Sequence, residues 1–221
     1  MTAITAPGAT VQPPDIETEL AQADPALGRV IAAAIARIGQ QRIKPSRAAP
    51  FEALARAVIY QSVSEKAAVA IFARLKETVG GPLAPAKILA MPQGSMMAVG
   101  LSKSKANAIR NLAAWFAANP KTAEALPELS DDDVVKALTA VAGIGAWTVN
   151  VFLIFNLGRH DVMPASDLGI RRGVQLVYGL EDVASPKQVH EKAQCWRPYR
   201  SIASIYLWNA VKLKVGPGDL S

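Results

Sequence analysis

Asp167 is the carboxylate whose position in the sequence is best suited to chemistry. It follows Pro164, which ends one element, and Ser166, which we expect to cap the next helix, so Asp167 is predicted in the first turn of that helix. The helix dipole stabilises an ionised carboxylate there, and such a group can stabilise a nearby positive charge or direct a water molecule. Standing alone, a first-turn acid usually only stabilises its helix. Asp161 ranks second, because it lies in a predicted loop with no element to position it.

Two glycines, Gly143 and Gly145, separate two predicted helices. A dinucleotide-binding loop is excluded, because a helix rather than a strand precedes the glycines and Thr148 occupies the third glycine position. A tight hairpin between helices fits better, since its N–H groups and helix dipole attract a phosphate without reading a base. An ordinary turn between helices is the alternative. The hairpin residues predicted to contact DNA are Gly143, Ile144, Gly145, Ala146 and Thr148.

Aromatic side chains are candidates for a ligand pocket. Trp208 shares one helical face with Ser201 and Ser204, and this small-residue face leaves room for a flat ligand. Trp147 begins the helix after the glycines, where it could line a cleft or pack in the core. Tyr60 is a weaker third candidate.

The elements that must position these residues are helical, because strand patterns are nearly absent and helical spacing recurs throughout. We predict an all-α fold, with residues 1–14 as a flexible tail and residues 15–221 as the folded domain. One lobe is expected at about 51–138, and a second from the N-terminal helix together with about 139–215. The expected helices cover residues 16–38, 51–59, 64–79, 103–118, 131–141, 146–155, 167–178, 186–195 and 198–215.

Composition limits the function classes. The chain has 221 residues and a formal charge of +6, which favours an anionic partner. One cysteine, Cys195, excludes an internal disulfide and any four-cysteine metal or iron–sulfur site. The start of the chain lacks a secretory signal, and the most apolar stretch, Val149–Leu157, is too short to span a bilayer. We therefore expect a cytoplasmic protein.

Several motifs together resemble one known family. The sequence is similar to the helix-hairpin-helix DNA glycosylases, and specifically to the 3-methyladenine DNA glycosylase II branch in a short form without the N-terminal β-rich domain. The resemblance covers about Phe51 to Trp208. The motifs that carry it are residues 51–64, residues 99–113, the hairpin at 141–148, Asp167 placed 22 residues after Gly145, and residues 196–208.

The resemblance implies which residues act in catalysis, base binding, ion binding and DNA contact. Two all-α lobes would flank a DNA-binding cleft, with Asp167 as the catalytic aspartate and Trp147, Trp208 and Tyr60 around the base. No cofactor would be required, but Na⁺ or K⁺ could bind the hairpin through backbone carbonyls. Those carbonyls would come from Thr139, Val141 and Ile144, and further DNA contacts would come from Gln61, Ser62 and Arg171.

The implied reaction is hydrolysis of the N-glycosidic bond of alkylated purines in double-stranded DNA, after the base is flipped out of the helix. These bases already carry positive charge, so no strong general acid is needed. Lyase-competent relatives have a lysine where this chain has Trp147, so we expect no strand cleavage. Ser62 replaces the leucine that intercalates in the best-known relative, and Gln61, Tyr60 or Val63 could fill the vacated stack. A monomer is expected.

Three alternatives remain. The same scaffold could act on another base, such as a mismatched or oxidised one. The chain could instead be a non-catalytic, structure-specific DNA-binding protein that keeps the hairpin. A helical protein unrelated to DNA would require all the motifs to coincide by chance.

Overall fold

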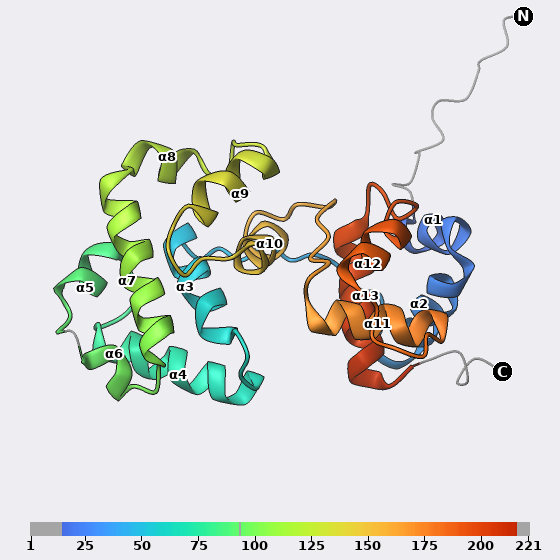
Figure 1. The fold of residues 1–221 in the computed structure, drawn as a ribbon, viewed down its shortest axis with the longest axis horizontal. Helices are drawn as coiled ribbons and strands as arrows, with labels where there is room; N and C mark the ends of the chain where they lie inside the picture. The colour runs from blue at the N-terminus through green and yellow to red at the C-terminus, as the bar shows by residue number, and fades with distance from the viewer. Residues whose placement is uncertain (1–14, 93, 216–221) are drawn as a thin grey trace, which may run out of the picture.

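The computed structural model describes residues 15–92 and 94–215, and within them it is built from helices with no β-strand (Figure 1). The predicted all-α fold is confirmed. The helices are α1 (Ile16–Ala23), α2 (Pro25–Ile38), α3 (Pro50–Tyr60), α4 (Glu65–Thr78), α5 (Pro85–Ala90), α6 (Ser95–Ala98), α7 (Lys103–Ala118), α8 (Pro120–Ala125), α9 (Asp131–Thr139), α10 (Ala146–Phe155), α11 (Leu168–Tyr178), α12 (Pro186–Lys192) and α13 (Arg200–Leu213). None of the described helices combines the length and apolar character needed to cross a membrane.

The helices form two lobes, each with its own core (Figure 1). Lobe one contains α3 to α10, and its core includes the predicted apolar stripe of α3 from Phe51 to Ile59. Lobe two brings α1 and α2 together with α11, α12 and α13 from the other end of the chain. Burying each large apolar side chain contributes roughly 1.5–3 kcal/mol. Each lobe is therefore stabilised mainly by its own cluster of buried residues.

The lobe boundary lies later than the sequence predicted. Helix α10 packs against α3 and α9, and Val149, Phe152 and Leu153 are buried in the core of lobe one. The predicted boundary at residue 138 is therefore wrong. The reason is that α10 is apolar on most of its sides and has to be surrounded by other helices. The predicted tail at residues 1–14 lies outside the described residues.

The predicted single helix at 16–38 is divided at Asp24. The Asp24 carboxylate accepts hydrogen bonds from the N–H groups of Ala26 and Leu27, both at 3.1 Å, and Pro25 follows as the first helical residue. An aspartate cap followed by proline starts a new helix. The same buried carboxylate also accepts a hydrogen bond from the indole of Trp196 at 2.8 Å, which ties α2 to the C-terminal part of lobe two.

Two chain segments connect the lobes, residues 39–49 and residues 156–167. They meet near the end of α10, where Ser46 N–H donates to the carbonyl of Phe155 at 2.8 Å. The amide of Asn156 donates to the carbonyls of Ser46 and Ala48 at 3.3 and 3.0 Å. The connections therefore brace each other at the side of the cavity described below.

Candidate active site

Asp167 lies at the N-terminus of α11 as its cap residue. Its Oδ1 accepts a hydrogen bond from the backbone N–H of Ile170 at 2.8 Å. The sequence predicted Ser166 as the cap and Asp167 one position inside the helix, and this was wrong by one residue, since Ser166 is exposed and Asp167 performs the capping. The carboxylate is still at the positive end of the helix dipole, as expected.

Two tryptophan indoles hold the Asp167 carboxylate. Trp147 Nε1 donates to Oδ2 at 2.6 Å, and Trp208 Nε1 donates to Oδ1 at 2.8 Å. Together with the capping bond these charge-assisted hydrogen bonds fix the orientation of the carboxylate. Trp147 lies in the first turn of α10, in lobe one, whereas Asp167 and Trp208 belong to lobe two. The site is therefore assembled from both lobes.

Gly169 permits the close approach of Trp208 to the carboxylate. A Cβ atom at this position would lie 2.8 Å from Trp208 Cδ1 and 2.9 Å from Asp167 Oδ1. Any larger residue would push the indole and the carboxylate apart. This close contact explains why the third residue of the Asp-Leu-Gly sequence at the start of α11 is a glycine.

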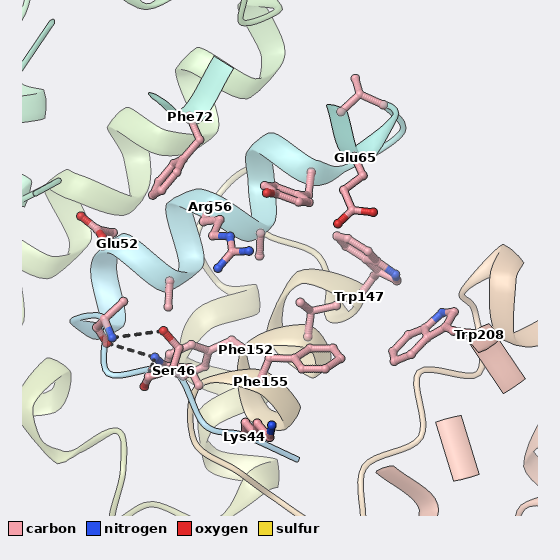
Figure 2. A pocket seen from close by; sticks show the side chains of 17 residues that line it. Lys44, Ser46, Glu52, Arg56, Glu65, Phe72, Trp147, Phe152, Phe155 and Trp208 are labelled. Atoms are coloured by element: carbon pink, nitrogen blue, oxygen red, sulfur yellow. Dashed lines mark hydrogen bonds between the residues drawn. The ribbon is translucent and has the colours of Figure 1, made fainter. Parts of the chain in front are cut away.

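A cavity of about 790 Å³ opens beside these residues (Figure 2). All three residues predicted for the base pocket, Trp147, Trp208 and Tyr60, line it, and Asp167 adjoins it through its bonds to the two tryptophans. Phe155 also lines it, with its ring centroid 5.8 Å from that of Trp208. The cavity therefore has aromatic walls contributed by both lobes. Sequence reasoning missed most of the other lining residues, among them Lys44, Arg56, Glu65 and Phe155.

The small-residue face of α13 is not open as predicted. Ser201 and Ser204 are fully buried. Ser201 Oγ accepts from the N–H of Val162 at 3.0 Å and donates to the carbonyl of Arg159 at 2.7 Å. The small side chains let the connection at 156–167 pack closely on α13, and only Trp208 from this face reaches the cavity.

The predicted hairpin connects α9 to α10. Gly143 has a positive φ of 92°, and a Cβ there would lie 2.6 Å from the Cβ of Ala108 on α7. The side chain of Ile144 is buried in the core, so only its backbone remains for contacts outside. Gly145 and Ala146 are exposed, and a Cβ on Gly145 would meet nothing within 4 Å. The N-terminal amides of α10 are therefore open to a ligand at this point.

Part-buried hydrogen bonds fix the turn between α3 and α4 to α10 and α7. Gln61 Nε2 donates to Thr148 Oγ1 at 2.6 Å, and Thr148 is fully buried. The prediction that Thr148 contacts DNA is therefore wrong for its side chain, which points into the protein because it sits on the inner side of α10. Lys105 Nζ donates to the carbonyls of Ile59 at 2.8 Å and Gln61 at 2.5 Å, and burial lowers the pKa of this lysine.

The tip of this turn remains exposed. Ser62 has a positive φ of 52°, and Val63 is 40% exposed. Tyr60 and Val63 both line the cavity, but Tyr60 is half-buried and the side chain of Gln61 is bonded to Thr148, so Val63 is the most exposed of the three residues proposed to fill the vacated base stack.

Two other charged candidates are engaged in contacts within lobe two. The Asp161 carboxylate pairs with Arg200 at 2.6 Å and Arg197 at 2.9 Å, which explains its presence without a catalytic role. Arg171 Nε donates to the carbonyl of Ala184 at 2.6 Å. Its predicted contact with DNA phosphate stays a prediction.

Comparison with known proteins identifies the family. Residues 55–198 match the family described as the HhH-GPD superfamily base excision DNA repair protein. The chain belongs to this superfamily. The matched segment contains the hairpin, Asp167 and Trp147.

Individual relatives agree with this assignment. The chain is 38% identical over 167 residues to DNA-3-methyladenine glycosylase 1 of Schizosaccharomyces pombe, covering 74% of this chain and 73% of that protein. The solved S. pombe 3-methyladenine DNA glycosylase in complex with abasic DNA superposes with a TM-score of 0.79 at 33% identity, covering 90% of this chain and 97% of that one.

A Bacillus halodurans DNA-3-methyladenine glycosidase superposes with a TM-score of 0.73 at 31% identity, covering 91% of each chain. The predicted family, helical architecture and enzyme class, a base excision DNA glycosylase, are confirmed.

Proposed function

We propose that this protein hydrolyses the N-glycosidic bond of alkylated purines, of the 3-methyladenine and 7-methylguanine type, in double-stranded DNA. The observation that carries the proposal is the Asp167 carboxylate held by two indoles at the edge of an aromatic cavity. The names of the relatives at 38% and 33% identity support the choice of alkylated purines.

The aromatic walls suit a flipped, positively charged base. Leaving the duplex costs stacking energy, which contacts with Trp147, Trp208, Tyr60 and Phe155 offset. An alkylated purine that carries positive charge is also attracted to the faces of electron-rich rings. A neutral purine gains less from the same walls.

Asp167 supplies the charge that bond cleavage requires. As the bond from C1′ to the purine nitrogen breaks, its electron pair leaves with the base, which becomes neutral, and positive charge develops on the sugar. The fixed carboxylate stabilises that charge, and water adds at C1′ with loss of a proton. The products are the free base and an abasic site. An indole at position 147 cannot form a Schiff base, so the strand stays intact.

Contacts with the phosphate backbone come from the hairpin. The exposed backbone at Gly145 and Ala146 lies at the N-terminus of α10, where amides and the helix dipole attract an anion. Residues Ser62 and Arg171 would add contacts at the edges of the cleft. The enzyme acts as a monomer on the DNA.

A monovalent cation is proposed at the hairpin. The carbonyls of Thr139, Val141 and Ile144 are hard oxygen donors that suit Na⁺ or K⁺. The Val141 carbonyl also accepts a hydrogen bond from Ile144 N–H at 3.0 Å, so it keeps one lone pair for an ion. A bound cation would rigidify the turn and add positive charge near the phosphate.

Single-turnover release of methylated purines from duplex DNA tests the function. Wild type is compared with Asp167→Asn, and binding to an abasic-site duplex is measured in parallel. Asparagine can keep the capping bond and the bond from Trp208, but its amide nitrogen faces the Trp147 donor. We expect the variant to bind the abasic duplex and to release base at least about 100-fold more slowly.

Asp161→Asn is the matched control, because this carboxylate is occupied by Arg197 and Arg200. It should release base at the wild-type rate. If wild type binds DNA but frees no alkylated base, the proposed specificity is wrong. Strand cleavage by wild type would contradict the monofunctional mechanism.

A further inference from the structure

Glu65 occupies a place in the cavity wall that the reaction described so far does not use. It is the first residue of α4, immediately after the cap Ser64, and its side chain is exposed and lines the cavity. Figure 2 shows Glu65 pointing from α4 toward Trp147. Among the hydrogen bonds and ion pairs of residues 15–92 and 94–215, none involves its carboxylate.

The other charged residues of the cavity wall are two basic ones, Lys44 and Arg56, and one acid, Glu52, and Lys44 is exposed. Glu52 accepts a hydrogen bond from Leu83 N–H at 2.6 Å and pairs with Lys76 at 3.6 Å. The Arg56 guanidinium lies 5.1 Å from the centre of the Tyr60 ring. Glu65 is therefore the wall carboxylate that remains available to a bound molecule.

We propose that Glu65 is a specificity-determining residue that makes the cavity prefer purines carrying a positive charge. The inference rests on the proposed function, in which a flipped purine enters beside Trp147. An ionised carboxylate facing that space attracts a cationic base and offers nothing comparable to a neutral one. Glu65 would thus add a charge criterion to the shape criterion set by the aromatic walls.

The position of Glu65 separates its effect from that of Asp167. A cationic purine loses its charge as the glycosidic bond breaks, because the bonding electrons go to the base. The attraction to Glu65 is therefore present in the bound substrate and fades in the transition state, whereas the attraction between Asp167 and the sugar grows. Glu65 should strengthen binding of the substrate without raising the rate of bond cleavage.

A binding experiment isolates this effect from catalysis. The complex of the enzyme with an abasic-site duplex is titrated with 3,9-dimethyladeninium, a permanent cation, and with neutral 9-methyladenine, using tryptophan fluorescence. We expect Glu65→Gln to weaken binding of the cation about fivefold and to leave the neutral base unchanged. Glu65→Lys should reverse the preference. Glu77→Gln, an exposed position near the other end of α4, is the matched control and should change neither affinity.

Kinetics give a second, independent result. In single-turnover release of 7-methylguanine, Glu65→Gln should raise the enzyme concentration needed for half-maximal rate. It should also raise the maximal rate, by up to the same factor, because the lost attraction stabilised the bound substrate more than the transition state. An equal loss for cationic and neutral bases would show that Glu65 merely stabilises its helix, and an unchanged preference would also overturn the proposal. Failure of wild type to release any methylated purine would instead refute the proposed function, while the titration still decides the role of Glu65.

Discussion

The two hairpin glycines offer a test in which one substitution should damage the fold and the other only DNA binding. At Gly143 an alanine Cβ would lie 2.6 Å from the Cβ of Ala108, and φ is 92°. At Gly145, two residues later, φ is −95° and a Cβ meets nothing within 4 Å. The same chemical change is therefore expected to have different consequences.

The expected loss of stability follows from these contacts. Gly143→Ala combines about 1–2 kcal/mol for the positive φ with about 1–3 kcal/mol for overpacking against α7. For a domain of this size the total of about 2–5 kcal/mol corresponds to a fall in Tm of roughly 4–20 °C. Gly145→Ala costs up to about 1 kcal/mol, because alanine is a poorer helix cap than glycine.

Gly145→Ala should weaken DNA binding strongly although it costs little stability. Its added methyl group stands where a phosphate would approach the amides of α10, and losing one hydrogen bond to a charged group costs about 1.5–3 kcal/mol. Affinity for an abasic-site duplex should fall at least about tenfold. The assay pairs thermal unfolding with fluorescence anisotropy at one fixed salt concentration.

Two results would refute this reasoning. Wild-type affinity in Gly145→Ala would mean that no phosphate approaches the hairpin at that residue. A wild-type Tm in Gly143→Ala would mean that the hairpin does not depend on its close packing against α7.

Three further predictions concern other parts of the molecule. Trp147→Phe keeps an aromatic ring but removes the 2.6 Å bond to Asp167, so single-turnover release should slow about tenfold while abasic-duplex affinity stays within about twofold; an unchanged rate would show that the indole N–H does not position the carboxylate. Asp161→Asn breaks two ion pairs, one to a largely buried arginine, and should lower Tm by about 2–8 °C without slowing base release; slower release with an unchanged Tm would assign Asp161 to the chemistry. Burial raises the pKa of Tyr206 above its value in the unfolded chain, so its contribution to stability is present below about pH 10 and is lost as pH rises further. The free energy of unfolding in urea should therefore fall less steeply with rising alkaline pH in Tyr206→Phe than in wild type. Equal slopes of unfolding free energy against pH would exclude this tyrosine as the cause.

The parts of the site that the sequence could predict are those with a local signal. The glycines of the hairpin, the acid after Pro164 and the tryptophan at the start of α10 each stand in a recognisable pattern of helix ends. The division at Asp24 also had a local signal, an aspartate followed by proline, which the longer apolar periodicity concealed.

Other features depend on contacts between distant segments. A face with two serines and a tryptophan looks the same in a sequence whether it lines a cavity or packs on a loop, and here Ser201 and Ser204 are packed. The carboxylate of Glu65 carries no signal beyond that of any acid in a first helical turn. Its role depends on the position of Trp147, which lies 82 residues away along the chain.

The order of segments in lobe two has a consequence for synthesis on the ribosome. Lobe one is continuous from α3 to α10, so it can fold as soon as those helices have emerged. Helices α1 and α2 are made before lobe one, yet their apolar residues, including Leu27 and Val30, belong to a core that also needs α11 and α13, which follow lobe one in the chain. Lobe one is thus preceded by a pair of helices whose core partners are made only after lobe one has emerged. Temporary protection of that pair, for example by a chaperone, should therefore raise the yield of active enzyme.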